Sequence, residues 1–459
     1  MASKSKRARM APQRNFAKTF IYWATTVFVI KLIIIFSIAA GSIEILNKPY
    51  IVDGIWLGSD GENYITGFNA LIRDGIFSKE NILSYWPAGY PLIILFLSIL
   101  GKSWALTTLS IVQSLTFSFA AYLFASQLLR TRLKKYAYLV FILIILNPTL
   151  SLSSIAVGYE SLTASGFLIT AGLIIKDFIE KDNKKFIKYL VINSVIFGLL
   201  TFMQPRLILS GILINLFWVL IRNGVKASSL LVIVTLAITL FFPASLIYRN
   251  HQATGVNVIS TNLGVTMNIG AGDKATGGYM KKDYGVACEQ SGTAAQQDSQ
   301  KVKCVLDWYL SNPSKAVKLF YNKTLYFFSP WIGPEANGTM ARNPWLNISP
   351  IANIASTPDG NKLVYGGFGK LISWLWLLGG MGLIIYGFLI LWRLGSLEKF
   401  IALMAMIAVS TNWLVSLISI GDHRFRIPIM GMTLFLQAVG LKTLFSRGKV
   451  QVVDGPALR

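Results

Sequence analysis

Acidic residues are few in this sequence, 20 in all, and three of them stand where a carboxylate could do chemistry. Asp60 and Glu62 open a segment with helical spacing of apolar residues that ends at Gly75, and Glu160 is the only acid between positions 80 and 177. A carboxylate can act as a general base or bind a cation. The alternatives are structural. Asp60 would then compensate a helix dipole and Glu160 would cap the next helix. Glu62 would complete a capping box with Ser59.

Four arginines form a second set, at the predicted external ends of apolar segments. Arg206 opens one segment, Arg249 closes another, and Arg424 and Arg426 lie in the sequence His423–Pro428 just before a third. The planar fork of a guanidinium suits phosphate oxygens. The sequence therefore predicts that at least one of these arginines binds a phosphate group, and the alternative is contact with lipid headgroups.

Membrane-spanning helices must position these residues. The chain has 459 residues, 54% of them apolar and 14% charged, with a mean hydropathy of +0.56. This composition excludes a disordered chain and argues against a soluble globular enzyme. A helix needs about 20 mostly apolar residues to cross a bilayer. Ten segments qualify: Phe20–Ala40, Leu106–Leu128, Tyr136–Ser153, Leu162–Ile175, Phe186–Met203, Leu207–Leu220, Leu230–Ile247, Leu371–Trp392, Ile401–Ile420 and Ile427–Leu444.

Positive charge sets the predicted orientation. An eleventh apolar stretch, Tyr90–Leu100, is too short to cross and follows the breaker cluster Pro87–Pro91, so we expect a re-entrant or interfacial helix there. If it does not cross, the cytoplasmic segments hold 23 of the 43 basic residues but five of the 20 acids. Both termini are then cytoplasmic. The net charge of +23 is mostly an orientation signal, which argues against a nucleic-acid partner.

The predicted fold is therefore an all-α polytopic membrane protein with about ten transmembrane helices, the re-entrant or interfacial helix and a mixed external loop domain. Residues 1–18 form a basic cytoplasmic tail, 19–247 a membrane bundle that includes the external loop 41–101, and 248–370 the large external loop domain. Residues 371–444 form the C-terminal membrane helices and 445–459 a second cytoplasmic tail. Lys31 lies in the middle of the first span, where a charge needs a partner such as an acid inside the bundle.

Both cysteines of the chain, Cys288 and Cys304, lie in the large external loop. Disulfides persist outside the cytosol, so we predict a bridge between them, with two free thiols as the alternative. No metal-ligand spacing of Cys or His occurs in the sequence, and no metal or other cofactor is expected.

The order of several motifs resembles that of the GT-C membrane glycosyltransferases, which include protein O-mannosyltransferases and lipid A aminoarabinose transferases. The motifs are Asp60 with Tyr64 and Gly75, Tyr85 with Pro87–Leu92, Asn147-Pro148 followed by Glu160, the stretch from Arg249 to Tyr279, and His423–Pro428. Departures exist. Gly61 follows Asp60 where many relatives carry a second acid, Pro87-Ala88 replaces a double proline, and residues 280–370 match nothing in the family.

The resemblance implies transfer of a sugar from a polyprenyl phosphate, such as undecaprenyl phosphate, to an envelope lipid, glycan or protein on the external face, with inversion. Asp60 would be the base, and Glu160 would position the acceptor or share that role. The remaining residues would bind substrates. Arg206, Arg249, Arg424 and Arg426 would hold the donor phosphate, and Glu62, Tyr64, Tyr85, Tyr90 and His423 would contact the substrates.

The expected location is the membrane, with lipids as neighbours, and specifically a bacterial inner membrane with the active site facing the periplasm or cell exterior. Two other functions remain open. One is a polymerase or ligase of lipid-linked glycans, against which the ordered Asp60, Pro87–Leu92 and Glu160 motifs argue. The other is a lipid-glycan transporter or flippase, for which the sequence shows no inverted repeat.

Overall fold

The computed structural model describes residues 2–40, 51–52, 55–56, 60–224, 228–279, 285–329, 357–359 and 366–446. Within these residues the chain is almost entirely helical, which confirms the all-α prediction. One pair of short antiparallel strands occurs there, β1 (Ile51–Val52) and β2 (Ile55–Trp56), with Ile51 opposite Trp56.

Nine helices in the described part of the chain are long and apolar enough to cross a membrane, so the protein is an integral membrane protein. Each matches one of the predicted spans, although several begin or end a few residues away. They are α1 (Ala2–Ala39, apolar from Ala17), α5 (Ala105–Leu128), α8 (Glu160–Glu180), α9 (Asn183–Met203), α10 (Ile208–Asn223), α11 (Ser229–Thr254), α17 (Gly367–Trp392), α18 (Ser396–Ile418) and α19 (Met430–Phe445) with the preceding 3₁₀ helix η6 (His423–Ile429).

The predicted span Tyr136–Ser153 is not one continuous helix. It consists of α6 (Lys134–Ile145) and α7 (Pro148–Ser153), because the Asn147 side chain caps α7 by accepting a hydrogen bond from the Leu150 N–H at 2.9 Å. Proline at the first position of α7 lacks the N–H that would continue α6. The twelve residues of α6 extend only about 18 Å, too short to cross alone. Together, α6 and α7 still return the chain from the Leu128 end of the bundle to the Glu160 end.

The short apolar stretch near residue 90 forms α4 (Gly89–Leu97) and the 3₁₀ turn η1 (Ser98–Leu100), too short to cross a bilayer, as expected. It packs against α2 (Gly61–Asp74), whose apolar face includes Tyr64, Phe68 and Leu71. The N-cap of α2 is Asp60, so the helix begins one residue later than a capping box with Ser59 requires. Ser59 itself lies outside the described residues. It ends at Gly75, whose φ of 81° favours glycine.

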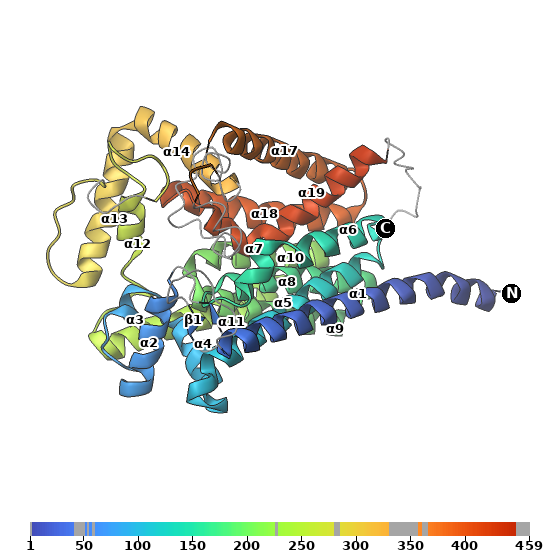
Figure 1. Ribbon diagram of the computed structural model, residues 1–459, viewed down its shortest axis with the longest axis horizontal. Helices are drawn as coiled ribbons and strands as arrows, with labels where there is room; N and C mark the ends of the chain where they lie inside the picture. Colours follow the sequence, from blue (N-terminus) through green and yellow to red (C-terminus); the bar gives the residue numbers. More distant parts are fainter. Residues whose placement is uncertain are drawn as a thin grey trace.

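The remaining helices lie at one end of the bundle. Figure 1 shows α2, α3 (Ile82–Tyr85), α12 (Leu263–Ile269) and α13 (Ala294–Ser311) on the left, whereas α1 begins and α19 ends on the right. The left end is the one predicted to be external. Helix α14 (Pro313–Phe328) follows α13 and returns toward the bundle. Met267, Val305, Tyr309 and Leu319 form a small separate core among α12, α13 and α14.

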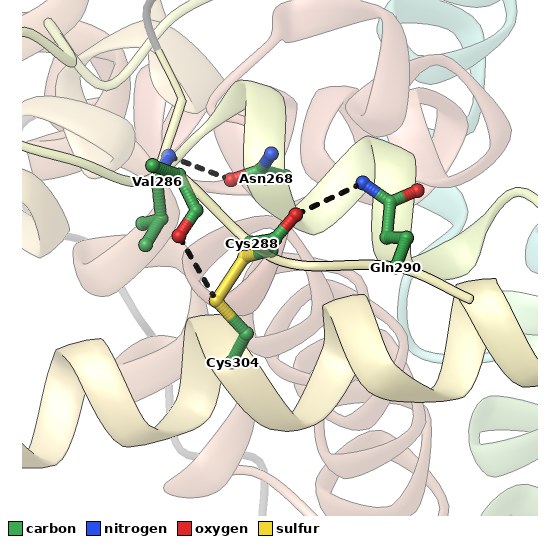
Figure 2. Close-up of a disulfide and its surroundings, with 6 residues drawn as sticks. Asn268, Val286, Cys288, Gln290 and Cys304 are labelled. Carbon is green, nitrogen blue, oxygen red and sulfur yellow. Dashed lines mark hydrogen bonds between the residues drawn. A yellow bond between two sulfur atoms is a disulfide. The ribbon is translucent and has the colours of Figure 1, made fainter.

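A disulfide joins Cys288 to Cys304 and so ties the segment before α13 to the middle of that helix. Figure 2 shows this link, together with the Val286 N–H that donates to Asn268 Oδ1 at 2.7 Å. The start of α13 is fixed by a capping box between Thr293 and Gln296.

Candidate active site

Three predicted site residues meet at the end of the bundle that is predicted to be external, where Arg424 lies between Asp60 and Glu160. Arg424 Nη1 is 2.6 Å from Asp60 Oδ2, and Arg424 Nε is 2.5 Å from Glu160 Oε1. The three side chains are 6%, 12% and 11% exposed in the order Arg424, Asp60, Glu160. Buried charges of this kind are stable only when they are paired with good geometry, so the cluster must form as a unit.

The local structure explains how the two carboxylates reach one point. Asp60 is the N-cap of α2 and Glu160 is the first residue of α8, so each sits at the positive end of a helix dipole. Arg424 lies on η6, whose N-cap Asp422 accepts a hydrogen bond from the Arg424 N–H at 2.8 Å. Gly158 makes room beside Glu160, because a Cβ atom at that position would lie 2.3 Å from Glu160 Oε2.

Three tyrosine rings form one wall of the cluster. Tyr64 lies edge-on to Tyr90 at 4.9 Å and to Tyr159 at 6.4 Å between ring centroids. The Arg424 guanidinium is 5.6 Å from the centre of the Tyr159 ring. Burial first, and then the neighbouring Tyr159 and Asp60 groups, raise the pKa of Tyr64 well above its ordinary value. Tyr64 therefore stays protonated and supplies an apolar ring, not an anion.

Arg206 is a second guanidinium beside the cluster, and within the described residues it has no carboxylate partner. Its guanidinium lies 3.9 Å from the centre of the Phe425 ring and donates to the Tyr159 hydroxyl at 3.4 Å. Its Nε and Nη1 atoms are buried and have no hydrogen-bond partner among those residues. A buried donor without a partner is costly, and a bound anion would satisfy both of these nitrogens.

The other two predicted arginines have different partners. Arg249 donates to the backbone carbonyls of Ile76, Ser78 and Leu83 and to the Asn250 side chain at 2.8 Å. It thereby holds the chain between α2 and α3 against α11.

Arg426 donates to the carbonyls of Phe328 at 2.6 Å and Ser329 at 3.0 Å, at the C-terminal end of α14. Cations are favourable at a helix C-terminus. For both Arg249 and Arg426, the fork is occupied by carbonyl oxygens of the protein itself.

The predicted substrate contacts are divided between two environments. Glu62 is exposed and forms no hydrogen bond or ion pair with the described residues, and half-buried Tyr85 packs edge-on to Trp86 at 5.5 Å. Tyr90 and His423 are buried instead. His423 Nδ1 is 3.7 Å from Asp422 Oδ1, and its Nε2 atom has no partner in the described part of the chain.

The sequence did not single out three residues that belong to this region. Tyr159 contacts both arginines, and its position directly before Glu160 was the only available signal. Asp422 is buried, and this burial raises its pKa to about 6. Lys323 on α14 is 0% exposed and donates to the Tyr309 hydroxyl at 2.7 Å and the Leu417 carbonyl at 2.8 Å, which ties the external helices to α18.

Within the described ranges, no group of three or more His, Cys, Asp or Glu residues could hold a metal ion. The cationic group that the two motif carboxylates share in this structure is the Arg424 guanidinium.

No protein family and no curated protein sequence matches this chain. Two solved structures of Archaeoglobus fulgidus oligosaccharyltransferase are similar to this chain over most of its length. One, tethered with an acceptor peptide that contains the NVT sequon, has 13% identity and a TM-score of 0.43 over 93% of this chain and 50% of that chain. The other, AglB in complex with an inhibitory peptide and a dolichol-phosphate, has 15% identity and a TM-score of 0.44 over 93% and 51%. The chain thus spans about half the length of both proteins, and at these values the likeness says nothing about substrates.

Proposed function

We propose that this protein is a GT-C-type membrane glycosyltransferase that moves a sugar from a polyprenyl-phosphate donor to an envelope lipid, glycan or protein, with inversion. The observation that carries the proposal is the Asp60–Arg424–Glu160 cluster. It unites, in one buried site, the three charged motifs whose order in the sequence resembles that family. The charge asymmetry of the loops supports a site on the external face, and we place the protein in a bacterial inner membrane.

Asp60 is the proposed general base. Arg424 binds its Oδ2 atom, whereas no described residue donates a hydrogen bond to Oδ1, which leaves that oxygen for the proton of the acceptor hydroxyl. The acceptor oxygen attacks the anomeric carbon while the bond from that carbon to the phosphate oxygen breaks, and the phosphate leaves with the electron pair. Glu160, held by the same guanidinium, orients the acceptor or shares the proton.

Arg206 is the proposed phosphate-binding residue. Arg424 is already neutralised by two carboxylates, and Arg249 and Arg426 donate to carbonyl groups. Of the four arginines, only Arg206 has two buried nitrogens without hydrogen-bond partners among the described residues, and it forms no ion pair with them. A departing phosphate would satisfy those nitrogens and gain a charge-assisted contact as negative charge develops. Arg249 and Arg426 are then supporting residues and not phosphate ligands.

The test separates donor binding from turnover. We expect Asp60→Asn to bind a polyprenyl-phosphate sugar with unchanged affinity, measured by native mass spectrometry in mild detergent, and to lose at least about 100-fold in turnover. Arg206→Ala should bind the donor about 10- to 100-fold more weakly, because a hydrogen bond to a charged group is lost.

Arg393→Ala, at an exposed position near the opposite end of the bundle, serves as the matched control and should change neither value. Full turnover by Asp60→Asn would refute the base. Unchanged donor affinity in Arg206→Ala would refute the phosphate site. A bound pyrophosphate-linked oligosaccharide would instead point to a polymerase or ligase.

A further inference from the structure

Lys31 is a buried cation inside the first membrane span, and its partner is not an acid. The side chain is 4% exposed, and its Nζ donates to Ser154 Oγ at 2.8 Å. The ammonium also lies 4.2 Å from the centre of the Phe117 ring. In the described part of the chain Lys31 forms no ion pair, so the acid that the sequence led us to expect is not its partner.

Ser154 begins the segment 154–159, which links α7 to α8 and has no regular secondary structure. Helix α5 holds the same segment. Gln113 Nε2 donates to the carbonyls of Ser154 at 3.3 Å and Ala156 at 2.9 Å. The Ser114 hydroxyl lies 3.1 Å from Ser154 Oγ, the atom that Lys31 contacts.

Tyr90 holds the far end of the segment. Its hydroxyl donates to Gln113 Oε1 at 3.0 Å and accepts from the Gly158 N–H at 2.8 Å. Tyr90 and Gln113 are both fully buried. A continuous set of polar contacts therefore runs from Lys31 through Ser154, Gln113 and Tyr90 to a point two residues before Glu160.

The depth of this network makes it costly to disturb. Lys31 lies about 12 Å along the helix axis from Ala39, where α1 ends. Irregular backbone at such a depth is tolerated only where protein groups satisfy its hydrogen bonds. Ionisable residues within membrane spans are rare for the same reason, and they mark functional positions by default.

We infer that Lys31 is a positioning residue for the proposed transfer. It fixes the segment 154–159 through Ser154, so that Glu160 meets Arg424 and Arg424 in turn holds Asp60. Lys31 touches no reacting atom in this arrangement and acts only through the segment. The inference rests on the proposed function, but the order of the segment can be measured without any substrate.

The experiment compares Lys31→Met, Ser154→Ala, the double variant and Lys31→Arg with the wild type, as full-length protein in detergent. Thr25→Val, at an exposed position on the same helix, is the control. Hydrogen–deuterium exchange of peptides covering 154–160 should be about tenfold faster in both single variants, because buried polar groups lose a partner. Peptides from α13 should exchange as in the wild type.

Steady-state kinetics supplies the second measurement. We expect kcat to fall about tenfold in each single variant while KM for the donor stays within about twofold, since Arg206 is untouched. The double variant should be no slower than the slower single variant, because both changes remove the same contact, the one between Lys31 and Ser154. Lys31→Arg, which keeps a cationic donor, should recover part of the rate.

Wild-type exchange in the 154–160 peptides of Lys31→Met and Ser154→Ala would overturn the inference, and so would multiplicative losses of kcat in the double variant. If Lys31→Met does not fold, the exchange measurement on Ser154→Ala tests the inference by itself, because that substitution removes only one oxygen atom. Absence of sugar transfer by the wild type would refute the proposed function and leave the exchange result intact, so the two failures are distinguishable.

Discussion

At the scale of single residues, the site depends on how each guanidinium uses its donors. Arg424 gives Nη1 to Asp60 and Nε to Glu160, whereas Arg206 keeps Nε and Nη1 without partners among the described residues. The two arginines therefore suit different tasks. One orders the carboxylates, and the other can accept the charge of a ligand.

Arg424→Lys tests the first of these tasks. A lysine ammonium is a compact point charge and cannot present two separate edges to Asp60 and Glu160. We expect kcat to fall about 10- to 100-fold, the cost of one lost hydrogen bond to a charged group, measured in a transfer assay. Arg393→Lys should keep its rate, and wild-type turnover in Arg424→Lys would show that the bridge is unnecessary.

The sequence could identify Asp60 and Glu160 as candidates because acids are few in the chain, and Arg424 because it lies at the predicted external end of an apolar segment. It could not divide the arginines into two groups. A guanidinium can bind either phosphate or carbonyl oxygens, and only the tertiary structure brings the Ile76, Ser78 and Leu83 carbonyls to Arg249. Tyr159 belongs to no sequence motif, and only the tertiary structure places its ring beside Arg206 and Arg424.

At the scale of elements, close helix contacts fix the bundle that carries the site. Helix α17 meets α19 through glycines: a Cβ atom on Gly387 would lie 2.0 Å from the Leu436 carbonyl oxygen, and one on Gly440 would lie 2.7 Å from that of Leu383. Small residues let the backbones of membrane helices approach each other. Hydropathy located these helices correctly. It also predicted one continuous span across Asn147-Pro148, where the structure has two helices, because the residues on both sides are apolar.

Gly387→Leu should separate α17 from α19. The added side chain has no space, and we expect a loss of at least about 2 kcal/mol in the free energy of unfolding. Thermal unfolding in detergent, followed by tryptophan fluorescence, measures it. Gly382→Leu on the same helix is the control, since nothing lies within 4 Å of its Cβ position. Equal melting temperatures for the two variants would contradict the close contact.

At the scale of the whole molecule, α14 joins the helices at the predicted external end to the membrane bundle. Lys323 reaches the Leu417 carbonyl near the end of α18, and Arg426 reaches back to the last carbonyls of α14. One buried cation and one partly buried cation thus connect the two parts, one from each part. This junction could not be read from the sequence, because a lysine in an amphipathic helix ordinarily points to water.

The junction should depend on pH. Burial lowers the pKa of Lys323 to about 7. Above that pH the lysine loses its proton in the folded protein, whereas in the unfolded chain it keeps the proton up to the ordinary lysine pKa. Stability therefore rises with pH across this window, and the cost of burying the ammonium is fully present below it. We expect slower hydrogen–deuterium exchange in α14, after correction for intrinsic rates, from about pH 7 to about pH 9.

Lys323→Met should remove that dependence, whereas Lys318→Met, exposed on the same helix, should keep it. An identical pH profile in wild type and Lys323→Met would assign the effect to another group.

The shared guanidinium also has an evolutionary consequence. Since Arg424 serves Asp60 and Glu160 together, losing the arginine leaves two buried carboxylates without a counterpart, and losing either carboxylate leaves one edge of the guanidinium without its acceptor. A lineage could therefore alter this trio only by replacing its members in concert. Among descendants of a common ancestor, positions 60, 160 and 424 should be inherited as one character, although they are encoded far apart in the gene.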